Sequence, residues 1–158
     1  MSLVATLNPG GAQAEGSWHL AVAWAAMKSD GRLHVAQWRA VEAVQALFAL
    51  PGPDPEMIRG DLQAVAERVA QVELSDDARR RLFATACWVV VVDGRTHGRE
   101  LLLLCELRRA LGRTPWEARR ILRLARAHLA RSGPEGGTRV LQALHTDLLR
   151  VAREGRPN

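Results

Sequence analysis

Apolar side chains recur every three or four residues along most of the chain, the spacing of one face of an α-helix. No segment shows a convincing alternation of apolar and polar residues, so no strand is expected. We predict an all-α fold of about seven helices in one domain, residues 17–158, behind a flexible N-terminal arm, residues 1–16. The helices are expected at about residues 18–29, 35–50, 55–74, 76–92, 98–111, 115–131 and 138–154.

Capping residues mark several of these boundaries. Ser17 and Ser75 are suitable N-caps for the first and fourth helices. The run Thr114-Pro115-Trp116-Glu117 is a capping box with proline at the first helical position, which predicts a helix start. Gly112 is placed to end the preceding helix, because glycine readily adopts the left-handed conformation found after helix C-termini.

A five-residue motif occurs twice, each time between two helices. Asp30-Gly31-Arg32-Leu33-His34 is followed 63 positions later by Asp93-Gly94-Arg95-Thr96-His97, and Gln37 and Glu100 stand seven residues after the respective aspartates. The repeat predicts two helical hairpins related by a pseudo-two-fold axis. Residues 82–92 and 98–111 are expected at the centre, because Leu101–Leu104 is apolar on every side.

An aspartate at a helix C-terminus costs roughly 0.3–1 kcal/mol against the helix dipole. Either a hydrogen-bonded loop or a bound cation could offset this cost at Asp93. An EF-hand is excluded, because aligning Gly94 with the invariant glycine of that loop places Val89 and Val91 at ligand positions that need oxygen donors.

Residues 84–94, with Glu100 and Leu101–Leu104, resemble the TerB-like family of tellurite-resistance helical domains, and residues 25–33 form the first copy of the pattern. The family includes the N-terminal region of some membrane-anchored DnaJ-like co-chaperones. The resemblance covers roughly residues 18–131. It implies paired helical hairpins in a non-enzymatic, bacterial, cytoplasmic stress-response module, with metal binding through clustered acids. Gln37 stands where the family pattern has an acid.

The loops supply oxygen and imidazole groups that could bind a divalent metal ion, the candidate cofactor, if the two loops converge. The candidate ligands are Asp30, Asp93, Glu100, His34 and His97. In the structural alternative, Asp93 accepts hydrogen bonds from loop N–H groups and Glu100 caps its own helix. Both interpretations remain open at this point.

The C-terminal third of the chain is strongly basic. Residues 108–158 contain twelve arginines and four acidic residues, a net charge of +8, whereas residues 1–107 have a net charge of −3. The sixth helix carries a basic stripe at helical spacing, formed by Arg119, Arg123 and Arg126 with Arg120 beside them. The stripe could bind an acidic protein, anionic lipid or nucleic acid. Alternatively, it is the solvated face of an amphipathic helix.

Another protein is the expected partner, and an anionic surface is the alternative. Nucleic acid is less favoured, because the chain has no tyrosine and few aromatic residues, so a platform for base stacking is not expected. No transmembrane segment is expected, since the longest apolar run, residues 82–92, is about half the length needed to cross a bilayer.

No combination of nucleophile, base and orienting group can be assembled from the sequence, so we expect a non-enzyme. A metal-dependent hydrolase built on the two loops is the remaining catalytic hypothesis. Three further histidines, His19, His128 and His145, lie in unrelated contexts. Cys87 and Cys105 are expected to be buried, inert thiols of a reducing cytoplasm.

The five tryptophans are interpreted as core or hairpin-packing residues. They are Trp18, Trp24, Trp38, Trp88 and Trp116.

Overall fold

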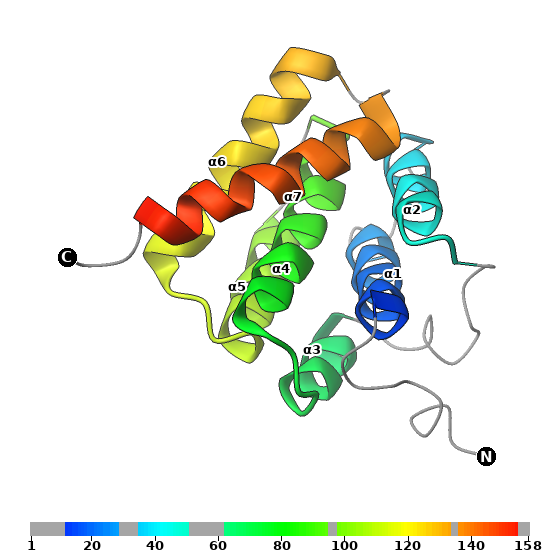
Figure 1. The fold of residues 1–158 in the computed structure, drawn as a ribbon. Helices are drawn as coiled ribbons and strands as arrows, with labels where there is room; N and C mark the ends of the chain where they lie inside the picture. The colour runs from blue at the N-terminus through cyan, green and yellow to red at the C-terminus, as the bar shows by residue number, and fades with distance from the viewer. Residues whose placement is uncertain (1–11, 29–34, 51–61, 95–97, 134–135, 155–158) are drawn as a thin grey trace.

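The computed structural model describes residues 12–28, 35–50, 62–94, 98–133 and 136–154 (Figure 1). These residues form seven α-helices and no strand, which confirms the expected all-α fold. The helices are α1 (Ala12–Lys28), α2 (Val35–Leu47), α3 (Leu62–Ala70), α4 (Asp76–Val91), α5 (Gly98–Ala110), α6 (Pro115–Ser132) and α7 (Gly137–Glu154).

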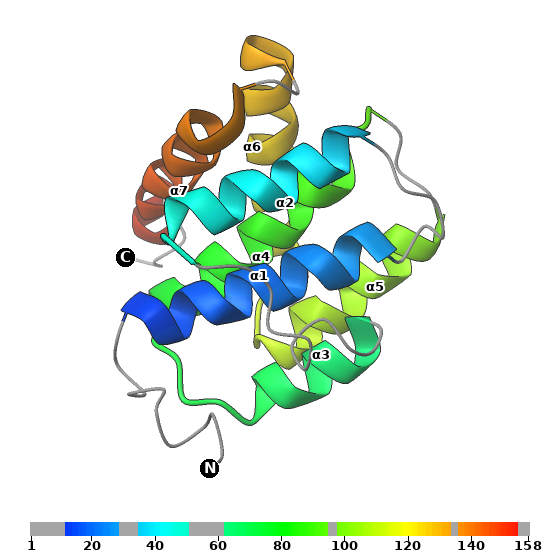
Figure 2. The ribbon, with the colours of Figure 1, turned by 90° about the vertical axis from the view of Figure 1, so that its right-hand side faces the viewer.

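Helix α4 lies at the centre of the molecule, as predicted. It contacts α1, α2, α5, α6 and α7, and Figures 1 and 2 show these helices arranged around it. Every residue from Leu82 to Val92 is buried, including Trp88 and Cys87. The apolar run therefore builds the core of the domain, where it is covered on all sides by other helices.

Local signals in the sequence explain where α4 and α6 begin. The Ser75 hydroxyl accepts a hydrogen bond from the Ala78 N–H at 3.1 Å, and the Thr114 hydroxyl accepts one from the Glu117 N–H at 3.1 Å. Each side chain satisfies a backbone donor that has no partner within the helix. The N-caps predicted at Ser75 and Thr114 are confirmed, whereas Ser17 lies inside α1 and does not cap it.

The end of α5 is also the one predicted. Gly112 has a positive φ of 66°, a conformation that glycine adopts without steric cost. The Gly112 N–H donates to the Arg109 carbonyl, and the Arg113 N–H donates to the Arg108 carbonyl at 2.9 Å. This pair of bonds is a Schellman motif, which satisfies carbonyl groups at the end of the helix.

The first helix begins earlier than predicted. Helix α1 starts at Ala12, so residues 12–16 are not part of a flexible arm and Ser17 lies inside the helix. Gly16 is buried against Phe48, and a Cβ at this position would lie 2.8 Å from the Phe48 Cβ. The close approach of these two residues fixes the start of α1 against the end of α2. The rest of the predicted arm, residues 1–11, lies outside the described residues.

The third helix ends at Ala70, not near residue 74 as predicted, and the chain turns there through a hydrogen bond from the Val72 N–H to the Val69 carbonyl at 3.1 Å. The predicted start of this helix, residues 54–61, lies outside the described residues.

The prediction that α5 is surrounded was wrong. Helix α5 packs on α3 and α4, and it buries Leu104 and Leu107. Its opposite side faces solvent, where Leu101 is 42% and Leu102 69% exposed. An apolar run lacks the polar face that would show which side of a helix is covered, so the sequence could not give this arrangement. The pseudo-two-fold relation of the two hairpins stays a prediction.

Candidate functional site

Two of the five predicted metal ligands lie in the described residues, on either side of the second loop. Asp93 follows α4 and is partly buried, and Glu100, in the first turn of α5, is fully buried. Asp30, His34 and His97 lie outside the described residues. Within the described part of the chain, no three His, Cys, Asp or Glu side chains are grouped so that they could hold a metal ion.

The repeated motif places two equivalent polar side chains in the interior. Gln37 on α2 is fully buried, as Glu100 is on α5. The Gln37 Nε2 donates to the carbonyl oxygen of Val89 on α4 at 3.4 Å. The first hairpin thus uses a neutral amide at the position where the second hairpin buries a carboxyl group.

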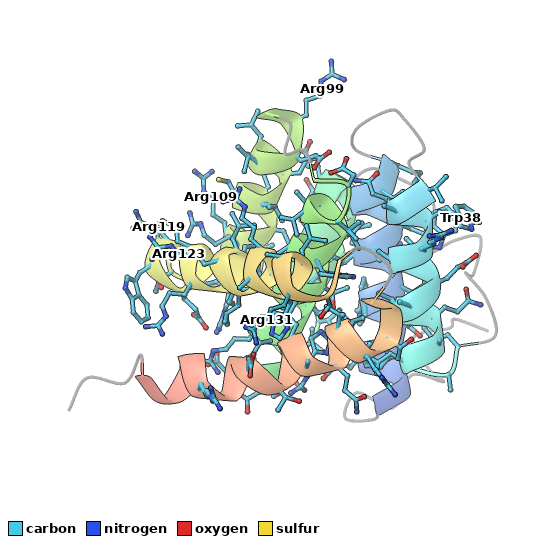
Figure 3. The ribbon with its side chains drawn as sticks, turned by 90° about the horizontal axis from the view of Figure 1, so that it is seen from above. Trp38, Arg99, Arg109, Arg119, Arg123 and Arg131 are labelled. Carbon is cyan, nitrogen blue, oxygen red and sulfur yellow. The ribbon has the colours of Figure 1, made fainter. Side chains whose placement is uncertain are left out.

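The predicted basic stripe lies on the outer surface of α6. Arg119, Arg123 and Arg126 are exposed, and Figure 3 shows Arg119 and Arg123 close together near the start of the helix. The guanidinium carbon of Arg120 lies 4.9 Å from the centre of the Trp116 ring, a cation–π contact. Trp116 is 47% exposed, so its prediction as a core or packing residue was wrong.

The only acidic residue of α6, Glu117, does not neutralise this stripe. Its carboxylate pairs with Arg80 of α4 and with Arg113, whose Nη1 lies 3.2 Å from the Glu117 Oε1. Arg113 also pairs with Asp76, and hydrogen bonding from this guanidinium lowers the pKa of the Asp76 carboxyl. This cluster anchors the start of α6 to the start of α4. The negative charge of Glu117 is therefore taken up by ion pairs with Arg80 and Arg113, away from the exposed stripe.

An open apolar groove lies between α5 and α6, beside the basic stripe. It has a volume of about 480 Å³, and Phe83 of α4 contributes to its lining. The other lining residues are Leu101, Leu104, Cys105, Arg108, Pro115, Ala118, Arg119 and Leu122. A second hollow of about 380 Å³ is lined by Trp116, Arg120, Arg123, Leu124 and Ala127. The arginines of α6 therefore border two hollows whose walls are mostly apolar.

The two cysteines differ, which contradicts the prediction that both are buried. Cys87 is fully buried in α4, and burial raises the pKa of its thiol. Cys105 is exposed in the lining of the groove, because α5 has solvent on that side.

A buried polar chain links α1, α4 and α7, which the sequence analysis missed. The Thr85 Oγ1 lies 2.7 Å from the His19 Nδ1 and 3.1 Å from the His145 Nε2. The His19 Nε2 lies 3.0 Å from the Glu15 Oε2, and the Arg81 Nε donates to the same carboxylate at 2.9 Å. His19 and His145 are thus neighbours, although their sequence contexts are unrelated. Only the Glu15–His19 and Arg81–Thr85 spacings of four residues hinted at the cluster.

The environment of this chain favours neutral histidines. Burial lowers the pKa of His19, against the opposing effect of Glu15, and burial lowers the pKa of His145 to about 3. Burial raises the pKa of Glu15, but hydrogen bonds from His19 and Arg81 outweigh that effect and lower it to about 2. With neutral imidazoles, His145 donates to Thr85, Thr85 donates to His19, and His19 donates to the Glu15 carboxylate.

An orienting carboxylate, a base and a hydroxyl group therefore do meet in this fold, contrary to the sequence-based expectation. Thr85 and His19 are both completely buried, which denies a substrate access to the hydroxyl group. We interpret the chain of hydrogen bonds as a structural connection between three helices. Its polar atoms satisfy one another inside an apolar core.

No protein-family model, curated protein or solved structure matches the chain. Among the described helices, none combines the length and the apolar character needed to cross a membrane.

Proposed function

We propose that the protein is a non-enzymatic binding module of the TerB-like kind, and that it recruits an acidic protein through the arginine side of α6. The observation that carries this proposal is the position of Arg119 and Arg123 beside the exposed Trp116 and the apolar groove. Arginine and tryptophan are the residues most enriched among those that dominate binding energy at protein interfaces.

Charge on this face is unbalanced in a way that favours an acidic partner. Glu117 is paired with Arg80 and Arg113, and so it offers little compensation to the exposed arginines. None of the residues that line the two hollows is acidic. A partner with carboxylates at matching positions would gain charge-assisted hydrogen bonds that a neutral partner would not.

A protein fits this face better than nucleic acid. A nucleic-acid groove typically combines backbone contacts with aromatic rings on which bases stack. Trp116 already lies against the guanidinium of Arg120, and it is the only aromatic residue in the lining of its hollow. The apolar lining of the other hollow suits side chains better than phosphates.

The test compares three anionic probes: poly-glutamate, a DNA duplex and phosphatidylglycerol vesicles. We expect poly-glutamate to bind, with an affinity that falls as salt is raised from 50 to 200 mM, since the contacts are ionic. The double variant Arg119→Gln/Arg123→Gln should lose most of this binding. The control Arg139→Gln, at an exposed position of α7, should retain it.

Absence of binding to all three probes at low salt would contradict the proposal. Tight binding to the DNA duplex or to the vesicles, with none to poly-glutamate, would contradict an acidic protein partner. It would indicate nucleic acid or anionic lipid, respectively, as the partner.

Metal binding at the second loop is a second candidate function, supported by the complete burial of Glu100, which follows Asp93 by seven residues across that loop. Buried carboxylates are stable when they are hydrogen-bonded, ion-paired or bound to a metal. The measurement is the metal content of protein purified without chelator. A stoichiometric divalent ion that is lost in Asp93→Ala would support this function, and metal-free protein that binds no added divalent ion would contradict it.

A further inference from the structure

The groove lies between α5 and α6, and apolar side chains make up most of its lining. Phe83, Leu104 and Leu122 contribute apolar side chains, and Leu104 is 5% exposed. Leu101, 42% exposed, and the thiol of Cys105 are accessible from solvent on the α5 side. Arg108 belongs to the α5 wall and Arg119 to the α6 wall. The groove is therefore apolar along its middle and positively charged on both walls.

We propose that this groove binds one amphipathic α-helix of the acidic partner protein. The apolar side of that helix packs against Leu101, Leu104 and Leu122, and its flanking carboxylates pair with Arg108 and Arg119. This inference rests on the proposed function and adds to it the form of the bound segment. The groove of about 480 Å³ lies within the ordinary range of ligand-binding sites.

The secondary structure of the groove favours a helix over an extended peptide. An extended peptide binds well where a sheet edge offers free backbone groups. The walls of this groove are α-helices, whose backbone groups are already bonded within the helix, and the described residues contain no strand. A helical segment brings its own backbone hydrogen bonds and needs only side-chain contacts.

The charge pattern specifies the flanks of the bound helix. Arg108 donates from its Nη1 to the Arg113 carbonyl at 2.9 Å, and Arg119 donates from its Nε to the Pro115 carbonyl at 3.4 Å. Each guanidinium has five N–H donors, so these bonds orient the side chains and leave further donors for a carboxylate. Glutamates on both sides of an apolar stripe are the matching pattern.

The length of the groove sets the length of the probe. The α5 residues that line it run from Leu101 to Arg108, and the α6 residues run from Pro115 to Leu122. Eight helical residues span roughly 10–12 Å. Two to three turns of a partner helix, with about three apolar anchors, would fill it.

The experiment uses two synthetic peptides of the same composition and the full-length protein. One peptide places leucines on one helical face with glutamates on both flanks, and the other has the same residues scrambled to remove the apolar face. The affinity is measured by calorimetry, and the reaction of Cys105 with a thiol reagent reports occupancy of the groove. Cys87 is fully buried and serves as the unreactive internal reference.

We expect the amphipathic peptide to bind at least roughly tenfold more tightly than the scrambled one and to slow the reaction of Cys105. The variant Leu101→Gln should remove this tenfold advantage, because it puts a polar amide where the peptide packs. Leu102→Gln is the matched control, since Leu102 is 69% exposed on the same helix but does not line the groove. Both positions are exposed enough that the variants should fold.

Equal binding of the two peptides, with Cys105 unprotected, would overturn the helix inference and leave the acidic-partner proposal intact. Binding of neither peptide would overturn both. Light scattering that shows a dimer, with Cys105 protected in the protein alone, would assign the groove to a second copy of the chain and overturn the inference. Protection of Cys105 by anionic vesicles but not by the peptide would overturn it in favour of a membrane surface.

Discussion

The two helical hairpins share a sequence motif but differ in how their second helices are covered. In the first hairpin, α2 is packed against α1, α4 and α7, and it buries Val41 and Val44. In the second hairpin, α5 packs mainly against α3 and α4, and it exposes Leu101 and Leu102. The additional contact with α7 covers more of α2, although Val35 and Trp38 stay exposed at its start, whereas α5 exposes Leu101 beside the groove.

The first helices of the two hairpins, by contrast, are buried and joined. Within the first hairpin, Trp24 of α1 meets Trp38 of α2 edge to face, with the ring centres 5.2 Å apart, which confirms the packing interpretation of these two tryptophans. Helix α1 also packs on α4, where His19 meets Thr85. The repeated motif gives each hairpin one buried polar side chain, Gln37 or Glu100, although the second helices are covered by different neighbours.

The prediction with the largest expected effect compares the buried and the exposed side of α5, using one leucine from each side. Leu107 is fully buried, so Leu107→Ala should lower the free energy of unfolding by about 2–5 kcal/mol through lost packing and a cavity. Leu102→Ala should change it by less than about 0.5 kcal/mol, because Leu102 is exposed. Chemical denaturation measures both. Equal losses would mean that α5 is covered on both sides.

The second prediction tests the hydrogen-bonded contact between α1 and α4, the first helices of the two hairpins. Thr85→Val keeps the shape of the side chain but removes the hydroxyl group that bonds His19 and His145. Leaving buried imidazole nitrogens unsatisfied should cost about 1–3 kcal/mol of unfolding free energy. Thr146→Val is the control, because that exposed hydroxyl bonds only within its own helix, to the Gln142 carbonyl. A negligible loss for Thr85→Val would contradict a structural role of the polar chain.

The third effect is the dependence of stability on pH. The folded state holds the pKa of His145 near 3, below the unfolded value of about 6.5, so acidification protonates the unfolded chain first. Stability should therefore be full above about pH 6.5 and fall as the pH is lowered towards 3. The lowered pKa of His19 acts in the same direction.

His145→Gln keeps a donor for Thr85 but removes one titrating group. It should reduce the stability lost between pH 7 and pH 5 by about 1–2 kcal/mol, as measured by denaturation at both pH values. An unchanged pH dependence would show that His145 is not held neutral by the fold.

The smallest expected effect concerns the motif itself. Glu100→Gln gives the second hairpin the residue that the first has at Gln37, and without metal it should change the unfolding free energy by about 1 kcal/mol or less. If the loop binds a cation, added divalent ions should stabilise the wild type more than the variant. Glu106→Gln, an exposed position of the same helix, is the control. Equal melting shifts for all three proteins would exclude Glu100 as a ligand.

The sequence alone determined the helices and most of their ends, because these depend on residues near one another in the chain. Periodic apolar positions placed all seven helices, and Ser75, Thr114 and Gly112 marked boundaries that the structure confirms. The basic stripe of α6 was also predictable, since its exposed arginines repeat at helical spacing. The early start of α1 was missed, because the contact of Gly16 with Phe48 joins separate helices.

Only the tertiary structure decided which helices meet and which faces stay open. His19 and Thr85 are 66 residues apart, and Thr85 and His145 are 60 apart, so no local pattern brings them together. The apolar run Leu101–Leu104 likewise gave no sign of which side would be covered. Burial is a property of neighbours in space. Helix α7 covers α2, whereas α5 packs mainly on α3 and α4, and the side of α5 towards α6 is left as the open groove.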